Sequence, residues 1–221
     1  MKRSRGKGKN RIVAYLGYPI LFFALTALLY LAGGKLLVNM IVDDFKLAAI
    51  QGAPEYTYDD RNQMGTPKKD GILKMGEVKL PLVGDQFGQI SCDAIGLKAP
   101  LYYGDTEKTL TNGIGVYIGS SLPGQGSTIL AGGHDTTFCA PLDAIAEDHI
   151  LTVHTTYGEY TYKVTATKVA DLLEDSAYHL ENTKETLILY TCYPFGEVNS
   201  NRTKRFYVYA EKTSGPTIQE E

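Results

Sequence analysis

An uncharged apolar run of 23 residues, Ile12 to Gly34, constrains this chain more than any other feature of its sequence. A helix needs about 20 apolar residues to cross a bilayer, so this run is long enough to span a membrane. Pro19 lies near its start, where a membrane helix tolerates proline. A secretory signal peptide has an apolar core of only about 7 to 15 residues. We therefore expect an uncleaved anchor over residues 12–34, with cleavage around residues 32–34 as the alternative.

The charges around this run predict its orientation. Six Lys and Arg residues, and no acidic residue, occur within residues 1–11. Positively charged flanks stay in the cytoplasm, so we expect residues 1–11 there and everything after about residue 35 outside the cell. The whole chain has a formal net charge of −3, which leaves −9 on the other residues. An acidic body argues against a nucleic-acid partner, because such a partner requires a basic surface.

The remainder of the chain divides by composition. Residues 35–79 begin amphipathic and become rich in charge, Gly and Pro, which is typical of a stalk or linker. Residues 80–212 consist of short apolar runs separated by turn residues, which predicts an all-β domain. Residues 213–221 are a C-terminal tail. The expected fold is a compact β-barrel or sandwich with short helical connections.

Period-two alternation locates individual strands in this domain. His149 to Thr155 and Tyr160 to Thr167 form a predicted hairpin. Other expected strands are Ser127 to Ala131, Glu185 to Cys192 and Arg205 to Ala210. Short helices or 3₁₀ turns are expected within Pro141 to Glu147 and Asp171 to Leu180.

Three cysteines form an odd set for an oxidising compartment, so at least one is free or paired between molecules. No C-x-x-C pair occurs, and no zinc site is expected. Cys92 and Cys139 read as small buried residues, with a disulfide between them as the alternative. Cys192 is either a core residue or a reactive thiol. The segment Tyr-Pro-Phe-Gly that follows it ends the strand, and reactive groups commonly lie where the chain leaves a sheet.

Two further side chains complete a candidate site. His134 follows Gly132 and Gly133, which would let the backbone turn sharply and present the ring at the end of a strand. Arg205 heads a predicted strand, whereas Arg202 lies in a loop, where a solvated cation is the ordinary expectation. A thiol, an imidazole and a fixed guanidinium can together perform acyl transfer on a peptide bond.

These residues resemble the motifs of the sortase family, most closely its class D group. The resemblance runs from about residue 81 to 210 and rests chiefly on TLILYTCYPF and RFYVYAE. Leu189 to Cys192 fits the family's L-x-T-C signature, although Ile188 stands where the family often has Thr. The Gly-His pair around His134 is retained, but Asp135 follows it where the family often has Arg.

The resemblance implies a closed β-barrel catalytic domain and a mechanism. Cys192 would attack the Thr carbonyl of an LPxTG-like sorting signal in a secreted protein and form a thioacyl enzyme. His134 would protonate the leaving amine and deprotonate the incoming one, Arg205 would hold the oxyanion, and Thr191 would be an auxiliary contributor. A peptidoglycan amine would accept the protein. No cofactor is implied, and no metal is expected, because the calcium ligands of class A sortases have no counterpart that can be placed here.

Three alternatives remain open from the sequence. A sortase can join pilin subunits instead of attaching proteins to the cell wall. A thiol peptidase could act mainly by hydrolysis, although L,D-transpeptidases carry an S-x-G-C motif that is absent here, and papain-like enzymes place Cys before His. A non-catalytic anchored binding module would make the Cys, His and Arg set a coincidence.

Overall fold

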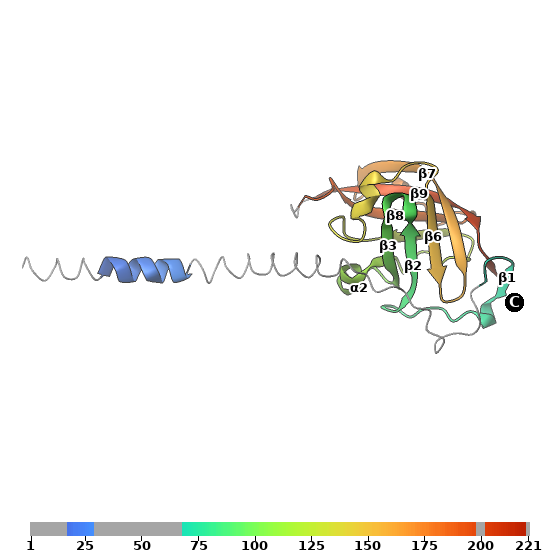
Figure 1. The fold of residues 1–221 in the computed structure, drawn as a ribbon, viewed down its shortest axis with the longest axis horizontal. Coiled ribbons are helices and arrows are strands. Elements are labelled where there is room, and N and C mark those ends of the chain that lie inside the picture. The colour runs from blue at the N-terminus through green and yellow to red at the C-terminus, as the bar shows by residue number, and fades with distance from the viewer. Residues whose placement is uncertain (1–16, 29–67, 198–201, 220–221) are drawn as a thin grey trace, which may run out of the picture. The chain divides into compact units, whose positions relative to one another are not determined.

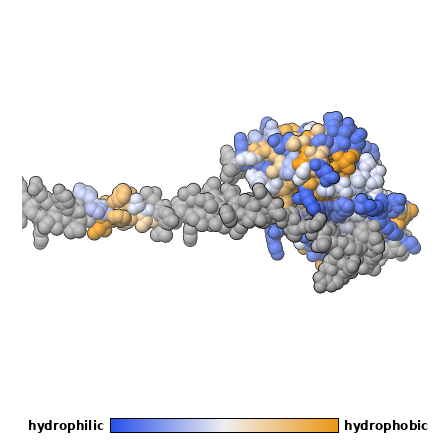
Figure 2. All heavy atoms as spheres, in the orientation of Figure 1, coloured by the Kyte–Doolittle hydropathy of each residue, from blue (hydrophilic) through white to orange (hydrophobic). Residues whose placement is uncertain are grey.

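The computed structural model describes residues 17–28, 68–197 and 202–219 (Figure 1). The chain forms two compact units, Met1–Ala49 and Ile50–Glu221. In the first unit, residues 17–28 are an exposed helix that is coloured largely as hydrophobic in Figure 2. Within the described ranges, no helix has the length and apolar character needed to cross a membrane. The rest of the predicted 12–34 span, the 1–11 tail and most of the 35–79 stalk lie outside the described residues.

Eight strands of the second unit close into a barrel (Figure 1), in the order β2-β3-β4-β5-β8-β9-β7-β6. The barrel closes because β6 also pairs with β2. Its strands are β2 Gln86–Cys92, β3 Leu97–Tyr103, β4 Ile114–Val116, β5 Thr128–Gly132, β6 Ile150–Thr155, β7 Glu159–Asp171, β8 Thr186–Tyr193 and β9 Lys204–Ser214. The predicted all-β closed barrel is confirmed.

Short helical segments connect the strands, as the sequence predicted. They are η2 Met75–Glu77, η3 Asp93–Ile95, α2 Glu107–Asn112, η4 Ala140–Ala144 and η5 Asp175–Ala177. The last two fall within or beside the segments where short helices were expected. In α2, the Thr106 side chain accepts a hydrogen bond from the Thr109 N–H and caps the helix.

The predicted hairpin is confirmed as β6 and β7, which pair antiparallel with Val153 opposite Tyr160. Tyr160, Tyr162 and Val164 alternate into the core, each at most 1% exposed. A register shift between Val164 and Ala166 interrupts the ladder with β9 and leaves Ala166 only half-buried. The turn before β7 is held by the Thr155 hydroxyl, which accepts hydrogen bonds from the N–H groups of Tyr157 and Gly158.

A small parallel sheet lies outside the predicted domain range of 80–212. It joins β1 Ile72–Lys74 to β10 Thr217–Gln219, from the segments that the sequence assigned to the stalk and the tail. Leu73 and Ile218 bury their side chains against the main core, with exposures of 5% and 8%. Ordered structure therefore continues past both predicted boundaries, because each short strand contributes an apolar side chain to the core.

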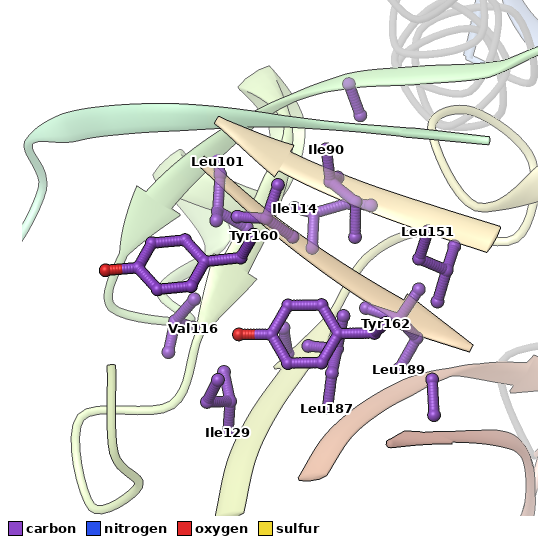
Figure 3. Close-up of a cluster of buried hydrophobic side chains, with 14 of the residues drawn as sticks. Ile90, Leu101, Ile114, Val116, Ile129, Leu151, Tyr160, Tyr162, Leu187 and Leu189 are labelled. Carbon is purple, nitrogen blue, oxygen red and sulfur yellow. The ribbon is translucent and has the colours of Figure 1, made fainter. Parts of the chain in front are cut away.

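The barrel interior is filled mainly by aliphatic side chains, and the rings of Tyr160 and Tyr162 lie among them (Figure 3). The rings of Tyr160 and Tyr162 point in the same direction among residues such as Val116, Ile129 and Leu187. The Tyr162 hydroxyl donates to the carboxylate of Glu185 at 2.7 Å. This bond offsets the cost of burying the Tyr162 hydroxyl in an apolar interior, whereas the hydroxyl of Tyr160 has no hydrogen-bond partner among the described residues.

Glu185 also fixes the start of β8. Its side chain is 5% exposed and pairs with Lys212 Nζ at 3.2 Å. Its two carboxylate oxygens accept the N–H groups of Gly124 and Gly126, each at 3.1 Å. Four donors therefore stabilise one buried charge. The opposite end of the same strand carries Cys192.

Candidate active site

Cys192 on β8 lies directly opposite Arg205 on β9 in an antiparallel ladder. Side chains alternate between the two faces of a strand. On β8, Leu187 and Leu189 face the main core, so Tyr190 and Cys192 share the outer face of the barrel. Both Cys192 and Arg205 are half-buried. The predicted antiparallel pairing of the strand that Arg205 heads with the strand of Cys192 is confirmed by this register.

His134 is brought toward the same end of the barrel as Cys192 by the parallel pairing of β5 with β8. Gly132 pairs with Tyr190, and the Gly133 N–H then donates to the Tyr190 carbonyl at 3.3 Å. His134 and Cys192 each follow this last pair by two residues, so a continuation of the same register would bring them level. The His134 carbonyl accepts the N–H groups of Thr137 and Cys139, so a tight turn begins at this residue. The fold thus brings the imidazole, thiol and guanidinium to one end of three neighbouring strands.

Thr191 lies on the inner face, opposite in direction to Cys192. It is 1% exposed, and its hydroxyl donates to the Gly133 carbonyl at 2.7 Å. The observed contact of this predicted auxiliary residue therefore joins the end of β5 to β8. It holds the backbone that leads to His134.

The two glycines before His134 are needed for a different reason from the one the sequence suggested. Neither adopts a positive φ, so neither is required for a left-handed turn. A Cβ on Gly132 would lie 2.5 Å from the Tyr190 ring, and a Cβ on Gly133 would lie 2.8 Å from Cys139 Sγ. Both positions exclude a side chain because neighbouring side chains approach the backbone closely.

The expectation that Arg202 is a solvated loop cation is wrong. Its side chain is only 17% exposed and its Nη1 pairs with Asp135 Oδ2 at 2.6 Å. The same carboxylate oxygen accepts the Gly196 N–H at 2.9 Å. Because the Asp135 side chain is 1% exposed, Arg202 is held by a buried partner that is distant in the sequence.

The three cysteines are all free. Cys92 and Cys139 are buried, as expected, and form no disulfide with each other. Burial raises the pKa of Cys139 to about 12, and nearby Asp135 contributes to this shift. Burial also raises the pKa of Cys92. Neither thiol can ionise appreciably near neutral pH, which leaves the half-buried Cys192 as the accessible sulfur nucleophile.

A pocket of about 340 Å³ opens beside Arg205. Its lining is mainly aromatic and aliphatic: Asp105, Tyr117, Leu130, Leu172, Tyr178, Leu180, Tyr190, Arg205 and Tyr207. Tyr190 precedes Cys192 by two residues on the same face of β8. Arg205 is the cross-strand partner of Cys192. Cys192 itself does not line the pocket, which reaches the candidate site through Arg205 and Tyr190. Among the described residues, no group of three or more His, Cys, Asp or Glu side chains could hold a metal ion.

Comparison with known proteins identifies the family of the chain. The family model for the sortase domain matches residues 90–213, more than half of the chain. This chain belongs to the sortase family. The sortase is 31% identical to Sortase D of Bacillus subtilis (strain 168) over 169 residues, 76% of this chain and 81% of that protein. The predicted similarity to the class D group is thereby confirmed, and the chain is an enzyme of the cysteine transpeptidase class.

Solved sortase structures share its fold. Sortase C of Clostridium perfringens SM101 is 26% identical, with a TM-score of 0.53, over 79% of this chain and 88% of that one. Sortase C2 of pilus island 1 from Group B Streptococcus is 27% identical, with a TM-score of 0.52, over 60% of this chain and 76% of that one.

Sequence reasoning located the thiol, imidazole and guanidinium of this sortase but missed the groups around them. Asp135 was noted only as a departure from the family pattern, and nothing local predicted its burial. Tyr190 and Tyr207 each lie on a predicted strand, where alternate side chains share one face. This alternation could have placed both rings on the outer face and so identified the aromatic lining of the pocket. The pairing of Asp135 with Arg202, 67 residues away, had no sequence signal.

Proposed function

We propose that this sortase is a membrane-anchored transpeptidase that cleaves an LPxTG-like sorting signal after its Thr and transfers the protein to a peptidoglycan amine. One observation carries the proposal: Cys192 lies opposite Arg205, and His134 follows the end of β5, the strand that pairs with β8 on its other side. This arrangement supports a reaction in which a nucleophile, a cation and an acid–base group act on one scissile bond.

In the proposed reaction, the Cys192 thiolate attacks the Thr carbonyl and forms a tetrahedral oxyanion. Arg205 stabilises this charge, a contribution whose loss typically lowers the rate by roughly 10² to 10³. The oxyanion collapses to a thioester as His134 donates a proton to the departing amine. His134 then takes a proton from the incoming amine, which attacks the thioester and releases the thiolate.

The pocket supports an extended peptide substrate with an apolar side chain. Its aromatic walls can bury the apolar residues that precede the Thr, and the neighbouring Arg205 would then lie close to the attacked carbonyl. Binding energy from these remote residues would position the scissile bond.

The anchoring and the location follow from the basic residues 1–11 and the apolar run 12–34. We propose a single membrane-spanning segment, a cytoplasmic N-terminus and an extracellular catalytic domain. Protease added to intact protoplasts should then digest the catalytic domain. Protection of that domain until the membrane is lysed would contradict this topology.

A second candidate acceptor is a pilin amine. The similarity to a sortase C2 of a pilus island, at 27% identity, favours this candidate. The full-length chain in detergent, incubated with an LPxTG-like peptide library and either a peptidoglycan-type amine or a lysine-containing pilin peptide, distinguishes the two by mass spectrometry. A Cys192 acyl adduct followed by transfer to one amine supports the proposal and identifies the acceptor. Release of free acid alone indicates a peptidase, and the absence of any adduct contradicts catalysis.

A further inference from the structure

A buried carboxylate lies immediately after His134 and is not accounted for by the proposed reaction. The Asp135 side chain is 1% exposed, and burying a carboxylate costs several kcal/mol unless partners offset the loss of water. Its Oδ2 accepts hydrogen bonds from Arg202 Nη1 at 2.6 Å and from the Gly196 N–H at 2.9 Å. Asp135 thus joins the segment after β5 to the loop between β8 and β9.

Arg202 continues this line of contacts to the site. Its Nη1 also donates to the Pro194 carbonyl at 3.1 Å, so the guanidinium spans the start of the loop that follows Cys192. The Arg202 backbone carbonyl in turn accepts Arg205 Nη1 at 3.1 Å, and the Lys204 carbonyl accepts the same nitrogen at 3.0 Å. The Arg205 guanidinium is therefore fixed by backbone whose position depends on the side chain of Arg202.

The charges of the pair also reach the thiol. The hydrogen bond to Asp135 raises the pKa of Arg202, and the Cys192 thiolate and Glu197 add to the shift. Arg202 therefore lies within electrostatic range of the thiolate. Asp135 carries the opposite charge and acts on the neighbouring Cys139. Paired at 2.6 Å, the two charges act on any neighbouring group in opposite directions.

We propose that Asp135 and Arg202 are a positioning pair for this sortase: Asp135 holds Arg202, the Arg202 backbone holds the Arg205 guanidinium beside Cys192, and the paired charges leave the thiolate in a balanced field. The catalytic consequence of the pair rests on the proposed function, whereas its effect on the thiol does not.

Alkylation of Cys192 by iodoacetamide at a fixed pH tests the electrostatic part in the full-length chain. The rate follows the thiolate fraction, and the other two cysteines are buried. Arg202→Gln leaves an unbalanced carboxylate and should slow alkylation by about threefold or more. Asp135→Asn leaves an unbalanced guanidinium and should accelerate it by a similar factor. The double variant should return toward the wild-type rate, and Lys184→Gln, which changes an exposed distant cation, should not alter it.

Single-turnover acylation tests the positioning part. Asp135→Asn should lower the acylation rate by about tenfold or more, even though its thiol is alkylated faster, because Arg205 loses its anchor. Arg202→Lys, which keeps the charge, should retain wild-type alkylation yet acylate slowly, since Lys lacks the planar fork. If Arg202→Gln fails to fold, Arg202→Lys still tests whether the Arg202 side chain positions Arg205.

Two results would overturn the inference: alkylation rates that move in the same direction or not at all in the two single variants, or acylation that is unchanged in Asp135→Asn. If the wild-type chain itself forms no acyl adduct with any peptide, the proposed function fails. The opposite alkylation shifts would still establish that the pair acts on the thiol.

Discussion

The thiol of Cys192 and the guanidinium of Arg205 belong to cross-strand partners in one antiparallel ladder between β8 and β9. Directly opposite residues in such a ladder have Cβ atoms about 4.5 to 5.5 Å apart. Backbone hydrogen bonds of a closed barrel thus fix the separation between the Cβ atoms of the two residues, and the Arg202 carbonyl in the preceding loop holds the Arg205 guanidinium. Each of the following predictions depends on this rigidity or on the contacts that maintain it.

Replacing the nucleophile should abolish chemistry and leave the fold intact. Cys192→Ala should form no acyl adduct, because the two remaining thiols are buried and un-ionised. Intact-protein mass spectrometry after incubation with a sorting-signal peptide measures the adduct, and circular dichroism checks the fold. Cys139→Ala is the matched control and should still acylate. An adduct on Cys192→Ala would exclude the thioester mechanism.

Arg205 should matter more than its charged neighbour on the same strand. Arg205→Ala should lower single-turnover acylation by about 10² or more, and Arg205→Lys should recover only part of the rate because it lacks the fork. Lys204→Ala is the control, since Lys204 is exposed and lies opposite Tyr193 rather than the thiol. Comparable losses at positions 204 and 205 would show that net charge, not a fixed donor, is responsible.

Glu185 should contribute to stability and not to chemistry. Glu185→Ala removes the acceptor of Tyr162, Gly124 and Gly126 and the charge partner of Lys212, whose Nζ keeps the Pro216 carbonyl. We expect a loss of about 3 to 5 kcal/mol in the free energy of unfolding, with the acylation rate of folded protein retained. Urea denaturation measures the stability.

The exposed ion pair between Lys184 and Glu211 serves as the control for the stability loss expected of Glu185→Ala. Its side chains are 67% and 47% exposed, so Glu211→Ala should cost less than about 1 kcal/mol. Equal losses for the two glutamate variants would mean that the buried network contributes no more than a surface pair.

Gly132→Ala should weaken peptide binding more than it slows the chemical step. The new Cβ would lie 2.5 Å from the Tyr190 ring, which lines the pocket. Displacing that ring should raise KM while kcat changes less, and overpacking should cost about 1 to 3 kcal/mol of stability. Steady-state kinetics with a sorting-signal peptide separates the two effects.

Gly76→Ala provides the control for added side-chain volume. A Cβ on Gly76 meets nothing within 4 Å, so both KM and stability should stay near wild type. A fall in kcat without a rise in KM for Gly132→Ala would place the effect of that substitution on His134 or the thiol instead of the pocket.

The sequence predicted those parts of the fold whose residue pattern lies within one short segment of the chain. The hairpin from His149 to Thr167 alternates strictly, and its turn residues lie beside it. The strands ending at Cys192 and beginning at Arg205 are apolar and separated by one loop, so their antiparallel pairing could be anticipated. For β1 and β10, each strand has three residues and the two are far apart in the chain. Such short segments have too few residues for a periodic pattern.

The groups of the site that escaped prediction depend on tertiary contacts. A polar residue such as Asp135, read locally, is expected on the surface. It is buried only because Arg202 arrives from another loop to pair with it. The requirement for glycine at position 132 likewise arises from an aromatic ring on a neighbouring strand. No local pattern encodes either contact.

Closure of the barrel limits how any peptide can be recognised. Each of the eight strands has a neighbour on both sides, so the barrel leaves few backbone groups free to pair with an added ligand strand. A peptide lying on the outer face must be selected through side-chain pockets and loops. Selectivity for one peptide over another can therefore be retuned by exchanging a few surface residues, while the scaffold that aligns the reacting groups stays unchanged.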